Sequence, residues 1–376
     1  MTTLVDHVQV EENLHARTVI LNRVHKLNIM SSQMVSRLHE VYTAFEKDPE
    51  AKLVILKGKG KAFCAGGDLA EYFHESTEGH WTLGVKILEN AITLMYQVAT
   101  LAKPQVSILN GVVMGVGCGL STHGRFRVVT ERTIFAMPEV VMGIIPAVGA
   151  SFFLSRLPGF FGEYLGLTGA RLDGTKMLAC GLATHFVPSI KLSLLDDALN
   201  KVNTSDPAII SAVIDECSEQ PPLKERTAYY RLLDIIDRCF SRKTIENVIS
   251  ALEMESMKGA DAWIDEALHL MKKASPLILK VFLKSIREGR LQGLRQCLAQ
   301  EYRISCHGLQ VGQDTFEGYR AIFLRKDHTP NWKPSRLELV NDEMVDRYFS
   351  KMDDDEWVDL DLPVRSDLST SIIAKL

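Results

Sequence analysis

The 376-residue sequence predicts an α/β fold in which parallel strands alternate with helices, followed by a long helical region. Up to about residue 190, short apolar and β-branched runs alternate with amphipathic stretches, which is the pattern of strand–helix–strand units. After about residue 195 the strand pattern fades and long amphipathic stretches dominate. We therefore predict a core over residues 1–195 and a mainly helical region over residues 196–376 that covers it.

The predicted strands are short runs in which apolar and β-branched residues gather. Between them lie predicted helices such as Ser32–Phe45 and Val85–Leu101, where apolar residues recur at helical spacing. In the second half, Ser275 and Pro276 predict the start of a helix ending at Gly289, because serine caps helices and proline suits their first turn. The strands are expected at Thr18–Leu21, Leu53–Lys57, Val106–Leu109, Phe126–Val129 and Thr184–Val187.

Composition and charge are those of an ordinary globular chain, with 46% hydrophobic and 24% charged residues. The net charge of -4 gives no electrostatic reason to expect nucleic acid or an anionic membrane as partner. No stretch approaches ~18 uncharged apolar residues and no apolar run follows a basic start, so we expect neither a transmembrane helix nor a secretory signal. The odd count of seven cysteines, with no CxxC pair, argues against a disulfide framework or a zinc site and fits a reducing compartment.

The final three residues suggest an address. Ala374, Lys375 and Leu376 resemble the small–basic–leucine tripeptide that the peroxisomal import receptor recognises. With average composition, roughly one chain in a few hundred would end this way by chance. We therefore expect a peroxisomal location, with the import receptor as a partner.

Three segments carry the candidate chemistry. Phe63–Asp68 contains two adjacent glycines, whose backbone can turn tightly and expose its N–H groups. Asn110–Leu120 has glycines at alternate positions before a predicted helix, so backbone N–H groups and the positive helix end can face one point. The first also fits a plain strand-to-helix turn. The second superficially resembles a dinucleotide-binding loop, but no convincing acidic partner follows it.

The third segment, Phe135–Glu139, places a glutamate behind a proline among apolar residues. Poor solvation raises the pKa of a carboxyl group and makes it a better base near neutral pH. The alternative is a glutamate at a helix N-terminus that satisfies backbone donors. The segment by itself favours neither interpretation.

Together the three segments resemble the enoyl-CoA hydratase/isomerase (crotonase) superfamily, and within it the 3-hydroxyisobutyryl-CoA hydrolase branch. The resemblance covers nearly the whole chain and implies a crotonase-like ββα spiral core. Asn22–Asn28 is similar to the family loop near the nucleotide, and Phe63–Asp68 and Met114–Gly119 are similar to its two oxyanion-hole loops. The hydrolase branch is indicated by His123–Arg127, Phe135–Glu139, Leu157–Gly159, Thr168–Leu172, Ala183–Val187, Phe316–Ala321 and Asn331–Pro334.

The resemblance implies roles for five residues. The N–H groups of Gly67 and Val116 would hold the thioester oxygen of an acyl-CoA, and Glu139 would act on water as a base or on the carbonyl as a nucleophile. Lys26 and Ala65 occupy implied coenzyme A-binding positions. No metal and no cofactor beyond the coenzyme A of the substrate is implied. The implied reaction is hydrolysis of a short 3-hydroxyacyl-CoA to free acid and CoA, in valine catabolism.

Two positions depart from the family pattern. The branch carries an aspartate eight residues after the glutamate, where this chain has Ala147. Losing a positioned acid or base commonly costs ~10²–10⁴-fold in rate. Val116 stands where the family usually has glycine; if that glycine needs a positive φ, valine would cost ~1–3 kcal/mol of strain.

These departures leave alternatives open. An acyl-CoA-binding protein with impaired catalysis is the main one. A hydratase or isomerase is less favoured, because Gly119 occupies the position of the second glutamate that hydratases of this fold use. The C-terminal helices are expected to cover either the acyl site or the trimer-type surface of the superfamily.

Overall fold

Two β-sheets form the centre of the computed structural model, which describes residues 6–78, 81–220, 223–259, 261–311, 313–354 and 357–365. The larger sheet has the strand order β1-β2-β3-β5-β7-β10, with β1 antiparallel to β2 and the other neighbours parallel. All five predicted strands lie in its parallel part, which confirms that prediction. The strands are β1 (Val8–Asn13), β2 (Ala16–Leu21), β3 (Leu53–Gly58), β5 (Gln105–Leu109), β7 (Phe126–Val129) and β10 (His185–Phe186).

The smaller sheet gives the core its repeating plan. Strands of the larger sheet are followed by short strands of the smaller one, and then by helical turns. The order is β3–β4–α2–α3, then β5–β6–α4, then β7–β8 and a 3-10 helix, which is the expected ββα spiral. The elements introduced here are β4 (Ala62–Cys64), β6 (Val112–Met114), β8 (Ile134–Ala136), β9 (Leu172–Asp173), α2 (Leu69–Glu78), α3 (Trp81–Ala99) and α4 (Val116–Thr122).

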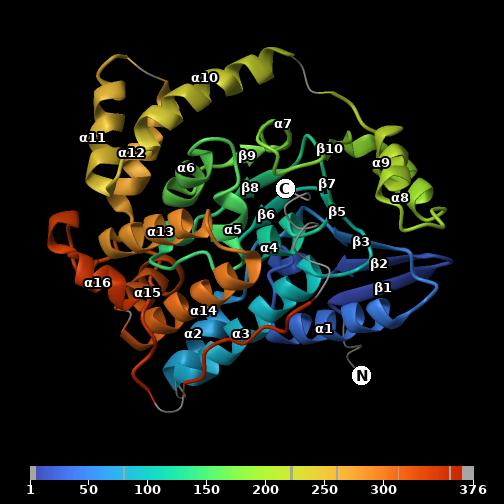
Figure 1. Ribbon diagram of the computed structural model, residues 1–376, viewed down its shortest axis with the longest axis horizontal. Helices are drawn as coiled ribbons and strands as arrows, with labels where there is room; N and C mark the ends of the chain where they lie inside the picture. Colours follow the sequence, from blue (N-terminus) through green and yellow to red (C-terminus); the bar gives the residue numbers. More distant parts are fainter. Residues whose placement is uncertain are drawn as a thin grey trace.

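Helices cover both faces of the larger sheet, so its strands are apolar on both sides. Successive side chains of β3 alternate: Leu53 and Ile55 pack with α8 (Leu192–Leu199) and α9 (Pro207–Asp215), while Val54 and Leu56 face the main core. Helix α1 (Ser32–Lys47), capped by Ser31, lies on the other side of the sheet from α8 and α9 (Figure 1).

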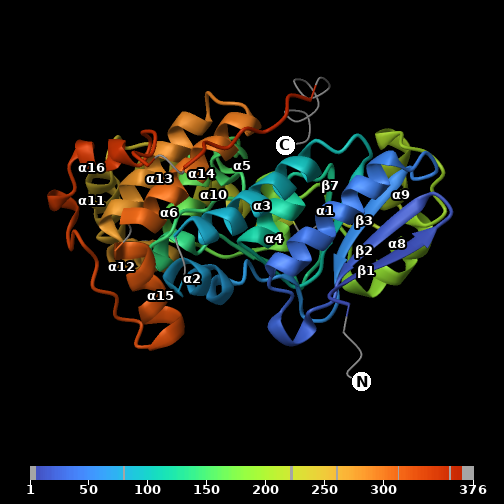
Figure 2. The same cartoon turned by 90° about the horizontal axis from the view of Figure 1, so that it is seen from below.

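The second half of the chain is helical, as predicted, with no strand after β10 in the described residues. Ser275 caps α13 by accepting a hydrogen bond from the N–H of Ile278 at 3.1 Å, which confirms the predicted helix start. Most of these helices gather at the end of the molecule away from β1 (Figures 1 and 2). They are α10 (Leu223–Phe240), α11 (Ile245–Ser256), α12 (Ala262–Lys273), α13 (Pro276–Gly289), α14 (Leu294–Val311), α15 (Gln313–Tyr319) and α16 (Asp342–Arg347).

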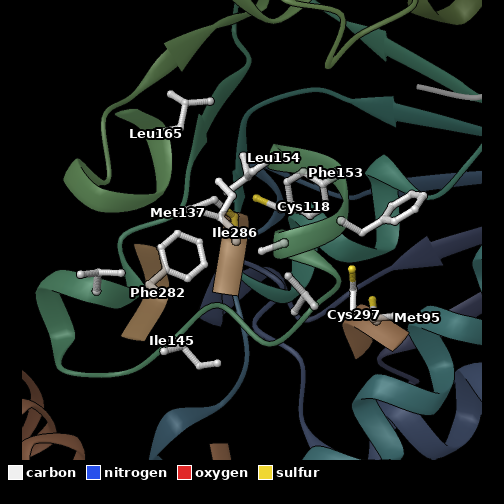
Figure 3. Close-up of a cluster of buried hydrophobic side chains, with 14 of the residues drawn as sticks. Met95, Cys118, Met137, Ile145, Phe153, Leu154, Leu165, Phe282, Ile286 and Cys297 are labelled. Carbon is white, nitrogen blue, oxygen red and sulfur yellow. The ribbon is translucent and has the colours of Figure 1, made fainter. Parts of the chain in front are cut away.

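A continuous apolar core joins the two predicted regions. Figure 3 shows Met95 of α3 and Cys118 of α4 in the same buried cluster as Phe282 and Ile286 of α13. Residue 195, the predicted boundary, lies inside α8, and the division into two regions stays a prediction. Three short helices, α5 (Ala150–Leu154), α6 (Phe161–Thr168) and α7 (Gly174–Ala179), complete the centre of the fold. No helix in the described part of the chain is long and apolar enough to cross a bilayer.

Candidate active site

A cavity of about 430 Å³ lies where the turns after β4, β6 and β8 meet the C-terminal helices. This size suits a small-molecule site. The structure brings all the residues predicted for the site to its lining, although they come from turns far apart in the sequence. These are Lys26, Ala65, Gly67, Val116, Glu139 and the departure position Ala147.

The turn after β4 points the N–H of Gly67 away from Met30, the residue that lies beside it. The N–H of Met30 donates to the carbonyl of Gly66, and the N–H of Asp68 donates to the carbonyl of Met30, each at 2.8 Å. Since successive amides of an extended segment point in opposite directions, the N–H of Gly67 points away from Met30. An ion pair of 2.7 Å between Arg23 and Asp68, both largely buried, holds the end of this turn.

The turn after β6 presents the N–H of Val116 at a helix start. Gly115 precedes α4 with φ 51° and ψ -119°, a conformation that glycine adopts readily. Val116 is the first residue of α4, so its N–H has no acceptor within the helix. Val116 is not among the described non-glycine residues with positive φ, so the strain considered for valine does not arise. Its Cγ2 lies 3.3 Å from where a Cβ on Gly67 would stand, which brings the two turns into contact.

Glu139 follows β8 and begins a 3-10 helix, Glu139–Met142. Its side chain is 7% exposed, and its Oε2 has no hydrogen-bond partner in the described structure. Burial, with a smaller contribution from the charge of Glu301, raises the pKa of Glu139 to about 7. Its Oε1 lies 3.1 Å from the position of a Cβ on Gly115, so the missing side chain of that glycine leaves room for the carboxylate beside Val116.

Both interpretations of Glu139, a capping carboxylate and a poorly solvated base, describe part of what the structure shows. Glu139 stands at a helix start, where its own backbone N–H lowers its pKa, but burial raises that pKa by more. The net result is a carboxyl group that exchanges its proton near neutral pH, which suits a general base.

Apolar side chains form another part of the cavity wall. Ala147 lines it together with Ile144, Ile145 and Val148, so this turn supplies no carboxylate. Two further carboxyl groups line the cavity in the described structure, and both are engaged elsewhere. Asp68 pairs with Arg23, and Glu71 accepts a hydrogen bond from the N–H of Ser32 at 3.1 Å.

Packing around Gly119 leaves no space for an acid at that position. A Cβ on Gly119 would lie 2.6 Å from Sδ of Met95 and 2.7 Å from Cβ of Val148. Real Cβ atoms essentially never come so close to a neighbour. A second glutamate, as water addition across a double bond requires in this fold, therefore does not fit without rearrangement.

The C-terminal helices cover this cavity, which favours the first of the two expected positions. The wall residues they contribute were not predicted from the sequence. On α14, Ile304, Ser305 and Gly308 follow the buried Glu301 at intervals of three, four and seven, so they share one helix face. A glutamate on an otherwise uncharged helix face is the signal that would have found this wall. The remaining C-terminal residues in the lining are Ile278, Thr315, Phe323 and Tyr348.

Comparison with known proteins decides the family. The family model described as enoyl-CoA hydratase/isomerase matches residues 16–349. The chain belongs to this family. Within the family it is 54% identical, over 371 residues, to a protein of Arabidopsis thaliana named 3-hydroxyisobutyryl-CoA hydrolase 1, covering 98% of this chain and 97% of the relative.

Two further comparisons agree with the family assignment. A second Arabidopsis thaliana protein, named probable 3-hydroxyisobutyryl-CoA hydrolase 3, is 52% identical over 373 residues, with 98% of each chain covered. Among solved structures, a carnitinyl-CoA dehydratase from Mycobacterium thermoresistibile is similar with a TM-score of 0.83 at 32% identity, covering 95% of this chain and 98% of that one. The crotonase fold and membership in the 3-hydroxyisobutyryl-CoA hydrolase branch are thereby confirmed.

Proposed function

We propose that this chain hydrolyses a short 3-hydroxyacyl-CoA thioester of the 3-hydroxyisobutyryl-CoA type to free acid and CoA, as a step of valine catabolism. The observation that carries the proposal is the meeting of Gly67, Val116 and Glu139 in one cavity. Relatives with 52–54% identity over nearly the whole chain bear the name of this activity.

The two backbone N–H groups act on the oxygen of the thioester. With the acyl carbonyl placed between Gly67 and Val116, both N–H groups donate to its oxygen, on which negative charge grows as the carbonyl carbon is attacked. Fixed donors stabilise this charge without reorganising, and removing one typically costs ~2.7–4 kcal/mol of transition-state stabilisation.

The carboxylate of Glu139 acts on the carbonyl carbon by one of two routes. As a base, it takes a proton from water while the water oxygen bonds to the carbon; the C–S bond then breaks and the proton passes to the sulfur of CoA. As a nucleophile, it forms an anhydride and releases the thiolate, and water then hydrolyses the anhydride. Both routes need the ionised carboxylate, so a pKa of about 7 places the change in activity near neutral pH.

Lys26 and Ala65 are proposed to hold the coenzyme A part of the substrate. Both line the cavity, and Lys26 is exposed, so its ammonium group is available to the phosphates of CoA. A cation at the cavity rim attracts such anionic groups and helps to orient the acyl end.

A second candidate function is acyl-CoA binding with little or no turnover. It is favoured by Ala147, which leaves the cavity lining over residues 144–148 without a carboxylate. Such a protein would keep the backbone donors and the cavity but lack a group that handles the substrate hydroxyl or moves a proton.

One experiment separates these functions. The purified protein is incubated with 3-hydroxyisobutyryl-CoA, and free thiol is followed for the wild type, Glu139→Gln and Ala147→Asp. A wild-type rate above the buffer blank that Glu139→Gln abolishes supports hydrolysis. A wild-type rate equal to the blank, together with a gain in Ala147→Asp, supports the binding protein. A robust rate that survives Glu139→Gln contradicts the assignment of the site.

We also propose that the protein acts in the peroxisome. The support is the resemblance of Ala374, Lys375 and Leu376 to the peroxisomal address, and these residues lie outside those that the structure describes. Deleting the tripeptide from a fluorescent fusion with a free C-terminus should move the protein to the cytosol. A peroxisomal signal that survives the deletion contradicts this proposal.

A further inference from the structure

Glu301 of α14 is a fully buried carboxylate that binds the turn behind the cavity. Its Oε2 accepts a hydrogen bond from the N–H of Gly149 at 2.7 Å. Its Oε1 accepts hydrogen bonds from the N–H and the hydroxyl of Ser151, at 2.7 and 2.6 Å. Burying a carboxylate is costly unless its oxygens find donors, and these three donors offset part of that cost. Burial still has the larger effect and raises the pKa of Glu301 to about 7.

The same turn is held from its other side by His123. Nε2 of His123 lies 2.8 Å from the carbonyl oxygen of Val148, and since a carbonyl only accepts, this nitrogen carries the hydrogen. Gly149 has φ +78°, and a Cβ there would lie 2.5 Å from Nε2 of His123. The turn is therefore fixed between His123, at the end of α4, and Glu301.

This turn is part of the cavity wall. Ala147 and Val148 line the cavity and directly precede Gly149, the first of the two residues that Glu301 binds. On α14 itself, Ile304 and Ser305 line the cavity from the helical turn after Glu301. A displacement of either segment would change the distance between the apolar wall and Glu139.

We propose that Glu301 is a positioning residue of the thioester site, which fixes the turn at residues 147–151 against the cavity and, once ionised, places a second negative charge near Glu139. The kinetic part of this inference rests on the proposed hydrolysis. The part that concerns the charge of Glu139 does not.

The surroundings of Glu139 support the electrostatic part. After burial, the charge of Glu301 is the effect that raises the pKa of Glu139 further, and the nearby thiol of Cys118 stays neutral because burial raises its pKa well above the usual value. Four charged groups on the other helices packed against Glu139–Met142 are engaged elsewhere. Glu163 of α6 pairs with Arg290, Lys272 of α12 with Glu253, Lys280 of α13 with Glu246, and Asp314 of α15 accepts from Ser275 and the N–H of Lys333.

The test compares Glu301→Gln with Glu163→Gln in the full-length protein. Glu163 is a matched control because it is equally buried but pairs with Arg290 and does not line the cavity. The ionisation of Glu139 is followed by ¹³C NMR of its carboxyl carbon, assigned with Glu139→Gln. We expect Glu301→Gln to lower the midpoint of Glu139 by roughly half a pH unit and to reduce kcat at least ~10-fold, while Glu163→Gln changes neither.

Two milder variants separate position from charge. Glu301→Asp keeps the charge but shortens the reach, so kcat should fall while the midpoint of Glu139 stays high. Ser151→Ala removes one hydrogen bond and no charge, with a fall in kcat of a few-fold expected. If Glu301→Gln does not fold, an unchanged kcat/KM in both milder variants overturns the positioning role.

The outcomes also distinguish this proposal from the proposed function. A wild type that releases no thiol ends the proposed hydrolysis, but the NMR midpoint still reports whether Glu301 acts on Glu139. A midpoint unchanged in a folded Glu301→Gln overturns the placement of charge. A kcat equal to that of Glu163→Gln overturns the positioning.

Discussion

The cavity has two halves that are built differently. The donor half consists of residues 65–67 and 115–116, and what it offers is backbone N–H groups positioned by glycine turns. The wall half consists of residues 144–151 with α14, and what it offers is side chains. A backbone donor survives a change of side chain, as the N–H of Val116 does, whereas the wall loses a carboxylate where the family aspartate is replaced by Ala147. We therefore expect the donor half to tolerate a change of side chain better than the wall half.

The largest expected effect on the rate comes from replacing Glu139, which belongs to neither half. Glu139→Gln keeps the size of the side chain but removes the carboxylate that both proposed routes need. We expect kcat for 3-hydroxyisobutyryl-CoA to fall by ~10²–10⁴-fold, with little change in substrate affinity. Thiol release and calorimetric binding measure the two quantities. A loss of affinity equal to the loss of rate would mean that Glu139 acts in binding rather than in chemistry.

A substitution at Val116 tests whether the donor half acts through its backbone N–H groups. Proline is tolerated at the first helical position, so Val116→Pro should leave α4 intact while it removes the N–H. The expected cost is ~2.7–4 kcal/mol, or ~10²–10³-fold in kcat. Val116→Gly, which keeps the N–H, is the matched control and should retain most of the rate. Equal losses in the two variants would show that the side chain, not the donor, matters.

Burial of Glu139 should also be visible in stability. A carboxyl group whose pKa is higher in the folded than in the unfolded state destabilises the fold when it is ionised. For Glu139 this loss of stability begins above pH 4.5, its unfolded pKa, and is complete above about pH 7, its folded pKa. It amounts to up to ~3 kcal/mol at 1.36 kcal/mol per pH unit. Glu139→Gln should therefore be more stable than the wild type at pH 8, with the difference shrinking towards pH 4.5. Urea unfolding at the two pH values measures this, and a pH-independent difference would contradict the assigned ionisation.

The smallest expected effect on the rate comes from a substitution in the wall half, at Ala147. Ala147→Asp restores a carboxylate to the apolar turn, and we expect thiol release to rise by at least ~10-fold, which is less than the ~10²–10⁴-fold that a well-positioned acid or base provides. Ala147→Asn is the control of similar size without a charge. If both variants gain equally, the effect is polarity at the wall and not acid–base chemistry.

The same two halves separate what the sequence predicts from what it leaves out. Gly67, Val116 and Glu139 were found because each stands in a short local motif. The wall contributed by α14 was missed, since the hydrogen bonds of Glu301 join residues about 150 positions apart, a pairing that no local pattern carries. In the fold, the parallel strands of the larger sheet were predicted, but β4, β6 and β8 of the smaller sheet were not, because three residues are too few to show a period. The sequence also left the backbone conformation of Val116 undecided, because it does not show which residue of the turn has the positive φ. In the structure that residue is Gly115, one position earlier.

The close packing at Gly119 restricts how this lineage can change its chemistry. An enzyme that adds water to a double bond with two carboxylates would need an acid at residue 119, and Met95 and Val148 already fill that space. Smaller residues at positions 95 and 148 would have to come first, and each would open a void in the core before the acid brought any benefit. A change from this branch to a two-carboxylate hydratase would therefore need more than one substitution, and the first of these would make the fold less stable.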